Sequence, residues 1–162
     1  MQIPVLPYAS ATLFVSRDLD DNVGNMSELE EMYRQARYVV DDGGVKFTIR
    51  LGQANDELNE FLDVCNADSW AFLTAHNPLS QRATDEHNEA RQAELIGVIG
   101  EMGFDFLRGY GTGEGWEPES SLLVLGITLE TAISLAVQFE QHAILFGVAG
   151  GEAELVWCDQ KH

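Results

Sequence analysis

Two short apolar segments constrain the fold of this chain more than any other feature. They are residues 70–74 (WAFLT) and residues 121–127 (SLLVLGI). Apolar runs of about four to eight residues are too short for a typical helix and are characteristic of strands buried on both faces. We therefore expect both segments to lie at the centre of a sheet against which helices pack.

Helix start and stop signals surround these segments. Asn55, Thr84 and Thr128 each precede a helical pattern, and their side chains are of the kinds that cap helix N-termini. The helix after Thr84 is the longest and should end at Gly103, because glycine is favoured where a helix stops. A capping box at residues 27–30 (SELE) predicts one more helix, which should begin there.

Other short apolar segments predict the remaining strands. The succession of strand, helix and strand across residues 121–146 indicates one crossover unit. Residues 109–115 are rich in glycine and lack the Lys-Ser/Thr ending of a phosphate-binding loop, so they predict a surface loop. The further strands are expected at residues 38–40, 45–51, 104–108, 142–146 and 154–157.

The length of 162 residues fits one domain. The expected class is α/β or α+β, with a mixed sheet of about six strands and three to four helices in a single globular domain over residues 1–162. Within it, residues 1–16 should form an N-terminal arm or an edge strand, and residues 38–157 should form the core.

The chain is strongly acidic. Its 27 Asp and Glu residues face nine Lys and Arg residues, which gives a formal net charge of -18. Such a field repels nucleic acids and anionic membranes, so direct binding to either is not expected. Three interpretations stay open: adaptation to a salty cytoplasm, a nucleic-acid mimic that presents carboxylates to a basic protein partner, and a plain solubility surface. No signal peptide or membrane-spanning run is present, and a cytoplasmic location is expected.

A polar turn follows the first apolar segment and contains Asn77 and Ser80. The next helix carries Asn88 and Arg91, which share a helical face with Leu95 because residues three and four apart are neighbours on a helix. Buried polar groups cost about 1–3 kcal/mol each when they are unpaired. Their presence on an inward face predicts either a ligand or an internal hydrogen-bond network.

Arg91 requires an anionic partner if it points inward. The partner is either a carboxylate of the protein, for which Glu119 is the first candidate, or the phosphate or carboxylate of a ligand. Glu119 and Ser121 lie at the start of the second apolar segment, and Gln141 lies between a helix and a strand. These positions are ends of elements, where open sheets commonly bind ligands.

The polar residues belong to an ordered set of motifs. The motifs are T-A-x-N-P-x-S, N-x-x-R, W-x-x-E-x-S with an apolar strand to Ile127, and F-x-Q-x-A-I; the matching residues are Thr74, Ala75, Asn77, Pro78 and Ser80, then Asn88 and Arg91, then Trp116, Glu119 and Ser121, then Phe139, Gln141, Ala143 and Ile144. Together they resemble a widespread bacterial domain-of-unknown-function family of the DUF3293 type, over roughly residues 70–147. His87 and Glu140 depart from the family pattern, which usually has Glu and Gly there. The resemblance implies a common fold and a common polar cluster, without an established activity.

Three functional hypotheses follow. In the first, a small anionic ligand binds in a polar pocket at strand ends, lined by Asn77, Ser80, Asn88, Arg91, Glu119, Ser121 and Gln141, with Glu119 as the candidate general base. In the second, the acidic exterior binds a basic protein partner. In the third, the polar motifs are purely structural. No His/Cys spacing predicts a metal site, and no cofactor is predicted.

Overall fold

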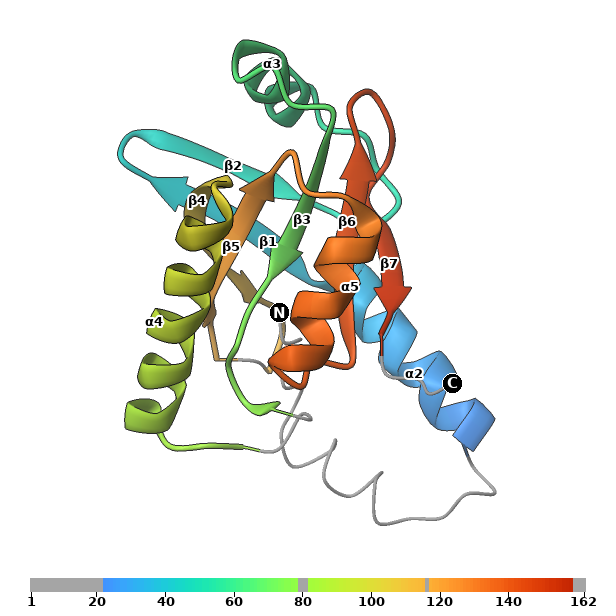
Figure 1. The fold of residues 1–162 in the computed structure, drawn as a ribbon. Coiled ribbons are helices and arrows are strands. Elements are labelled where there is room, and N and C mark those ends of the chain that lie inside the picture. The colour runs from blue at the N-terminus through green and yellow to red at the C-terminus, as the bar shows by residue number, and fades with distance from the viewer. Residues whose placement is uncertain (1–21, 79–81, 116, 159–162) are drawn as a thin grey trace.

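The structure is a computed structural model that describes residues 22–78, 82–115 and 117–158 (Figure 1). The N-terminal arm predicted at residues 1–16 and the candidate site residue Ser80 lie outside the described residues. In chain order the elements of the described part are α2 (Asn22–Gln35), β1 (Arg37–Asp42), β2 (Val45–Ile49), α3 (Asp56–Val64), β3 (Ser69–Leu73), α4 (Asp85–Met102), β4 (Asp105–Thr112), β5 (Glu119–Leu125), α5 (Leu129–Gln138), β6 (Ala143–Val148) and β7 (Glu154–Trp157).

The described strands form one seven-stranded sheet in the order β2-β1-β4-β5-β3-β6-β7. Every neighbouring pair in this order is antiparallel. The expectation of an α/β or α+β single domain is thereby confirmed as α+β, with one strand more than the approximately six that were expected. The parallel component of the expected mixed sheet is, in the described part, an isolated bridge between Leu51 and Ala153.

Two crossover units interlock at the centre of the sheet. Strand β3 is antiparallel to both β5 and β6, so β5 and β6 run in the same direction on either side of it, and α5 connects them. In the same way α4 connects β3 to β4 across β5. The crossover expected over residues 121–146 is therefore present, and it skips one strand. This succession is the split β-α-β arrangement of ferredoxin-like folds.

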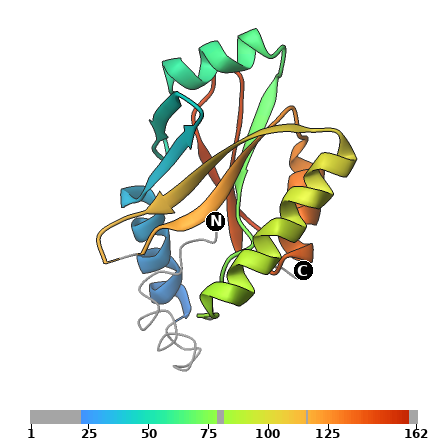
Figure 2. The same cartoon turned by 90° about the vertical axis from the view of Figure 1, so that its left-hand side faces the viewer.

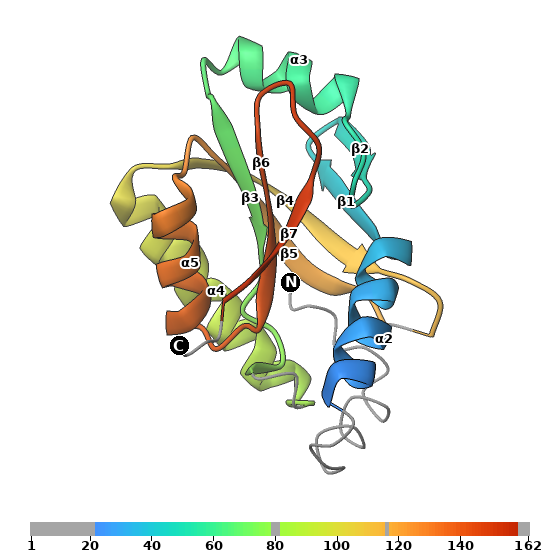
Figure 3. The same cartoon turned by 90° about the vertical axis from the view of Figure 1, so that its right-hand side faces the viewer.

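Helices cover both faces of the sheet. Figures 2 and 3 show α4 and α5 on one face and α2 and α3 on the other. Side chains alternate between the faces along each strand: on β3, Phe72 packs with the core under α2 and α3, whereas Ala71 and Leu73 pack with the core under α4 and α5. All three are at most 2% exposed, as expected for an apolar strand buried on both faces.

The sheet curls until its two edge strands meet at one end. There the backbone N–H of Gly52, just after β2, donates to the carbonyl of Ala153, just before β7, at 2.8 Å. Helix α2 packs inside the curl, where the ring centroids of Tyr33 and Trp157 lie 5.6 Å apart. The buried core therefore reaches back to Tyr33, which is fully buried.

Most of the predicted helix boundaries are present. The side chains of Asn55, Thr84 and Thr128 cap α3, α4 and α5, and α4 stops at Gly103, whose φ is 87°. The predicted capping box is wrong, because α2 already begins at Asn22 and includes residues 27–30.

The glycine-rich loop expected at residues 109–115 is also partly wrong. Strand β4 continues to Thr112 and includes Gly109 and Gly111. A Cβ atom at Gly109 would collide with the carbonyl oxygen of Val39 on β1. Here glycine serves a close approach between neighbouring strands rather than a flexible loop.

Candidate functional site

The chain leaves the sheet after β3 and passes between the first turns of α4 and the start of β5. The buried Asn77 lies at the centre of this crossing, with a positive φ of 46°. Asparagine is one of the few residues other than glycine that accept this backbone conformation. The backbone N–H of Asn77 donates to Oδ1 of Asn88 on α4 at 2.7 Å.

The side chain of Asn77 connects three parts of the chain. Its Nδ2 donates to Oε2 of Glu119 at 2.8 Å, and its Oδ1 accepts from Nδ2 of Asn88 at 3.0 Å and from the backbone N–H of Ala83 at 2.8 Å. We call Asn77, Asn88 and Glu119 the Glu119 cluster. Its members are between 2% and 5% exposed, so these hydrogen bonds are shielded from water.

Burial dominates the electrostatics of Glu119. Because ionisation is unfavourable away from water, burial raises the pKa of its carboxyl group well above the ordinary value. The hydrogen bond from Asn77 acts in the opposite direction with a smaller effect, and the nearby Glu117 carboxylate raises the pKa further. At the position of Glu119 the fold therefore favours a carboxyl group that keeps its proton.

A small cavity of about 60 Å³ adjoins the Glu119 cluster. This volume corresponds to roughly two water molecules, at about 30 Å³ each. At its rim Arg82 and Glu117 form an ion pair at 3.5 Å, and both side chains are more than half exposed. The remaining lining side chains include His76, whose pKa burial lowers to about 4, and Asp85 in the first turn of α4.

Arg91 lies on the side of the crossing that faces α5. Its Nε donates to the carbonyl oxygen of Ala75 at 3.3 Å, and one terminal nitrogen donates to that of Phe139 at 2.8 Å. The same nitrogen lies 3.5 Å from Oε1 of Glu140, so the internal anionic partner is Glu140 and the expected pairing with Glu119 is wrong. The C-terminal end of α5 offers Arg91 both free carbonyl groups and the negative end of the helix dipole.

Three further polar side chains hold the same stretch of backbone. Nε2 of Gln141 donates to the carbonyl of His76 at 3.1 Å, and Oε1 of Gln92 accepts from the N–H of Ala75 at 2.9 Å. The hydroxyl of Thr74 donates to the carbonyl of Ser120 at 2.6 Å. We call Thr74, Arg91, Gln92 and Gln141 the anchoring cluster.

The sequence interpretation missed two members of the anchoring cluster. Gln92 was detectable, because it follows Asn88 by four residues and so shares its face of α4. Thr74 belongs to the first motif, but the apolar segment before it predicts only that it ends a strand. Ser121, which was expected in the pocket, instead donates its hydroxyl to the carbonyl of Glu119 at 2.9 Å.

Glu140 occupies the position where the resemblance described above leads us to expect glycine. Its φ is 58°, in the left-handed region that favours glycine. The residue directly follows the C-cap of α5, where a left-handed residue commonly ends a helix. Replacing glycine by glutamate at this point strains the backbone but supplies a carboxylate to Arg91.

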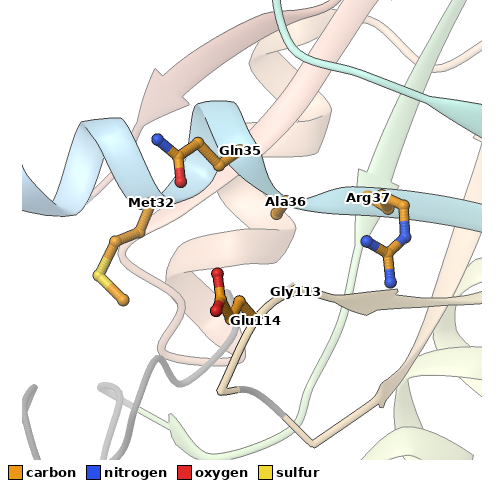
Figure 4. A pocket seen from close by; sticks show the side chains of 6 residues that line it. All are labelled: Met32, Gln35, Ala36, Arg37, Gly113 and Glu114. Atoms are coloured by element: carbon orange, nitrogen blue, oxygen red, sulfur yellow. The ribbon is translucent and has the colours of Figure 1, made fainter.

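Other kinds of site have less support. In the described part of the chain, no three His, Cys, Asp or Glu residues are grouped so that they could hold a metal ion. Among the described helices, none has both the length and the apolar character that crossing a membrane requires. A larger pocket, of about 360 Å³, lies between the end of α2 and the β4–β5 connection (Figure 4). It contains none of the predicted site residues.

The chain was compared with known protein families, curated proteins and solved structures. The model of a family described as "Protein of unknown function (DUF3293)" matches residues 73–144. No curated protein and no solved structure matches the chain. The matched region runs from the end of β3 into β6 and contains both polar clusters. Residues 73–144 are thus similar to the DUF3293 family, the family that the ordered motifs resemble.

Proposed function

We propose that this protein binds a small anionic ligand in the cavity beside Glu119. The observation that carries the proposal is a buried carboxyl group directly on a cavity. Burial of an ionisable group costs stability, and perturbed titratable groups in clefts concentrate at functional sites.

The chemistry of the cavity fits an anionic oxygen. A Glu119 carboxyl group that keeps its proton is a hydrogen-bond donor, while its Oε2 already accepts from Asn77. The cavity lies at the first turn of α4, whose positive dipole end favours negative charge. Arg82 at the rim supplies a cation, for which the ligand would compete with Glu117.

The size of the cavity limits the part of the ligand that enters it. A volume of about 60 Å³ admits one carboxylate or similarly small group, and the rest of a larger ligand would lie outside. If the ligand is processed, the Glu119 carboxyl group is the candidate proton donor or general base.

Within this proposal Arg91 is a positioning residue. Its donors already serve two backbone carbonyls and Glu140. Together with Gln92 and Gln141 it fixes Ala75 and His76, and so the place from which Asn77 reaches Glu119.

A second interpretation is that both clusters only hold the strand-to-helix turn in place. The observation that favours it is the extent of internal pairing: Asn77 makes three side-chain hydrogen bonds, all to groups of the protein. Glu119→Leu and Glu119→Gln together separate the two interpretations. Leucine removes the hydrogen-bond donor toward the cavity, whereas glutamine keeps an acceptor for Asn77 and, like the protonated carboxyl group, a donor. Glu117→Gln at the rim removes the competitor for Arg82 and should bind the probes at least as tightly as the parent.

The test uses acetate, glyoxylate and inorganic phosphate as probes, measured by thermal unfolding and by NMR titration. Ligand at 100 times its Kd stabilises a protein by about 2.7 kcal/mol, so even millimolar affinities are detectable. We expect at least one probe to stabilise the parent and the Glu117→Gln variant and to shift the Asn77 and Asn88 side-chain signals. Loss of this effect in Glu119→Leu with its retention in Glu119→Gln supports the proposal. Equal stabilisation in Glu119→Leu, or no response to any probe, contradicts it.

A further inference from the structure

Strand β7 has an open edge. It is the last strand in the sheet order, and β6 is its partner in the described part of the chain. The N–H of Cys158 donates to the carbonyl of His142 at 2.7 Å, which sets the register of this ladder. Because hydrogen-bonded positions alternate in an antiparallel ladder, Glu154 and Val156 also bond to β6. The backbone groups of Leu155 and Trp157 therefore point away from the sheet.

Pairing along this outer edge begins but does not continue. Just before β7, the outward carbonyl of Ala153 accepts from the N–H of Gly52 at 2.8 Å, and its N–H donates to the carbonyl of Gln53 at 3.2 Å. The chain then turns into α3, which Asn55 caps. Among the described residues, the backbone groups at the next two outward positions of β7, Leu155 and Trp157, have no partner on this edge. They form a row of the kind that can accept another strand.

A groove of about 250 Å³ runs beside this edge, between β7 and α2. Leu155 and Trp157 give it a partly exposed apolar surface. Its charged lining consists of Glu30, Arg34, Glu152 and Glu154, of which Arg34 pairs with Glu30 at 3.1 Å. The groove is therefore net negative, with Glu152 and Glu154 exposed along the edge.

From this combination we propose that the edge of β7 binds an extended, basic segment of a partner protein as an additional strand. The main-chain groups of Leu155 and Trp157 would pair with the segment, as in other cases of strand addition. Apolar side chains on one face of the segment would contact Leu155 and Trp157, and basic side chains would lie near Glu152 and Glu154.

Charge excludes the two simplest alternative occupants. A second copy of this chain, paired edge to edge, would bring its own Glu152 and Glu154 beside the same residues, and the chain as a whole carries a formal charge of -18. An acidic segment meets the same repulsion. The opposite edge strand, β2, is a poorer site, because Asn55 already donates to the carbonyl of Thr48 there at 2.7 Å. The surface on β7 shares no residue with the Glu119 cavity.

The test uses the full chain and a synthetic peptide of about ten residues that alternates lysine and valine. One comparison peptide is the same sequence with N-methyl groups on alternate amides, which keeps the charge and blocks strand pairing. A second replaces lysine by glutamate. Binding is followed by Trp fluorescence, and the contact is located by hydrogen exchange at single amides.

We expect the basic peptide to bind, to slow exchange of the Leu155 and Trp157 amides at least tenfold, and to bind about tenfold more weakly when salt rises from about 50 to about 500 mM. The double variant Glu152→Gln/Glu154→Gln should weaken binding severalfold. The control Glu57→Gln/Glu60→Gln, which removes two exposed carboxylates from α3, should leave it nearly unchanged.

Three results would overturn the proposal. Equal binding of the N-methylated peptide would mean attraction to the acidic exterior alone. Protection of other amides without protection of Leu155 and Trp157 would exclude this edge as the site. Absence of binding by the basic peptide would exclude it as well. Self-association of the free protein that protects the same two amides would assign the edge to a second copy of the chain.

Discussion

The two polar clusters around the crossing after β3 use similar residues in different ways. In the anchoring cluster, Arg91 and Gln141 bond mainly to backbone carbonyls, and the ion pair with Glu140 is half exposed. In the Glu119 cluster, side chains bond to one another around a titratable group beside a cavity. The anchoring cluster thus fixes the backbone after β3, whereas the Glu119 cluster holds a titratable carboxyl group.

This difference shows why a cationic residue in a motif need not be the ligand-binding one. Arg91 was expected to bind an anion because a buried guanidinium requires acceptors. Carbonyl groups at the end of α5 and at Ala75 meet that requirement. The group on which burial imposes the larger electrostatic cost is Glu119.

The largest effect is expected for Asn77→Ala. This change leaves Glu119, Asn88 and the Ala83 N–H without their shared partner and places alanine at a positive φ, so we expect a loss of about 3 kcal/mol. Urea unfolding measures it. Asn66→Ala is the control, since Asn66 also has a positive φ but is exposed. Equal losses in the two variants would mean that backbone strain, rather than the Glu119 cluster, determines the effect.

Arg91→Ala should destabilise the protein by about 2 kcal/mol, because in this partly buried site the Ala75 carbonyl loses the Arg91 donor and the Phe139 carbonyl keeps only the donor from Gln141. Arg91→Lys should recover part of this loss, since one ammonium group replaces one of the two contacts. Chemical denaturation of both variants checks the order. If lysine restores full stability, the positive charge stabilises the fold and simultaneous hydrogen bonds to both carbonyls are not required.

Glu119→Gln should change how stability depends on pH. The folded-state pKa of Glu119 is raised above its unfolded value, so its favourable contribution is complete below the unfolded pKa and is lost as pH rises through the folded pKa. The free energy of unfolding of the variant, relative to that of the parent, should therefore increase with pH. The increase should be smaller than the losses expected for Asn77→Ala and Arg91→Ala. Unfolding free energies of both proteins between pH 4 and 8 measure this, and parallel curves would refute it.

His76 acts in the opposite direction and cancels in that comparison. Its folded pKa of about 4 lies below the unfolded value of 6.5, so its contribution is complete above pH 6.5 and is lost as pH falls toward 4. The parent alone should therefore lose stability from this residue on acidification. His76→Gln should flatten that part of the pH profile.

The smallest effect is expected for Glu140→Gly. Relief of the left-handed backbone should stabilise by about 1 kcal/mol, and loss of the half-exposed ion pair with Arg91 should remove up to about 0.5 kcal/mol of that gain. Thermal unfolding of Glu140→Gly and Glu140→Gln separates the two contributions. A net loss in Glu140→Gly would show that the ion pair anchors Arg91 more strongly than its exposure suggests.

Features that depend on neighbouring residues were predictable. Asn55, Thr84 and Thr128 cap their helices because each capping side chain accepts from a backbone N–H only three residues further along the chain. The inward position of Asn88 followed from helical spacing alone. Ser27 is the exception, since a capping pattern inside a helix is overridden when the turns before it are also helical.

Features that depend on distant segments were not predictable. The partner of Arg91 lies 49 residues away in the chain, and nothing local distinguishes Glu140 from the other carboxylates. The sequence around Gly109 predicts a loop, and only the structure shows that the backbone of Val39 lies against this glycine. The edge of β7 is open because the curled sheet pairs Leu51 with Ala153 and the segment after Leu51 then turns away from β7 into α3.

The sequence by itself determined most of the elements, the strands buried on both faces, the likeness of residues 73–144 to the DUF3293 family and the polar residues that accompany the motifs. Only the tertiary structure decided which polar groups meet, that Arg91 serves backbone carbonyls, and that Glu119 is the buried titratable group on a cavity. The physical reason is the distance along the chain over which each interaction acts. Capping and periodicity act over a few residues, whereas burial and hydrogen-bond pairing depend on the surroundings that distant segments create.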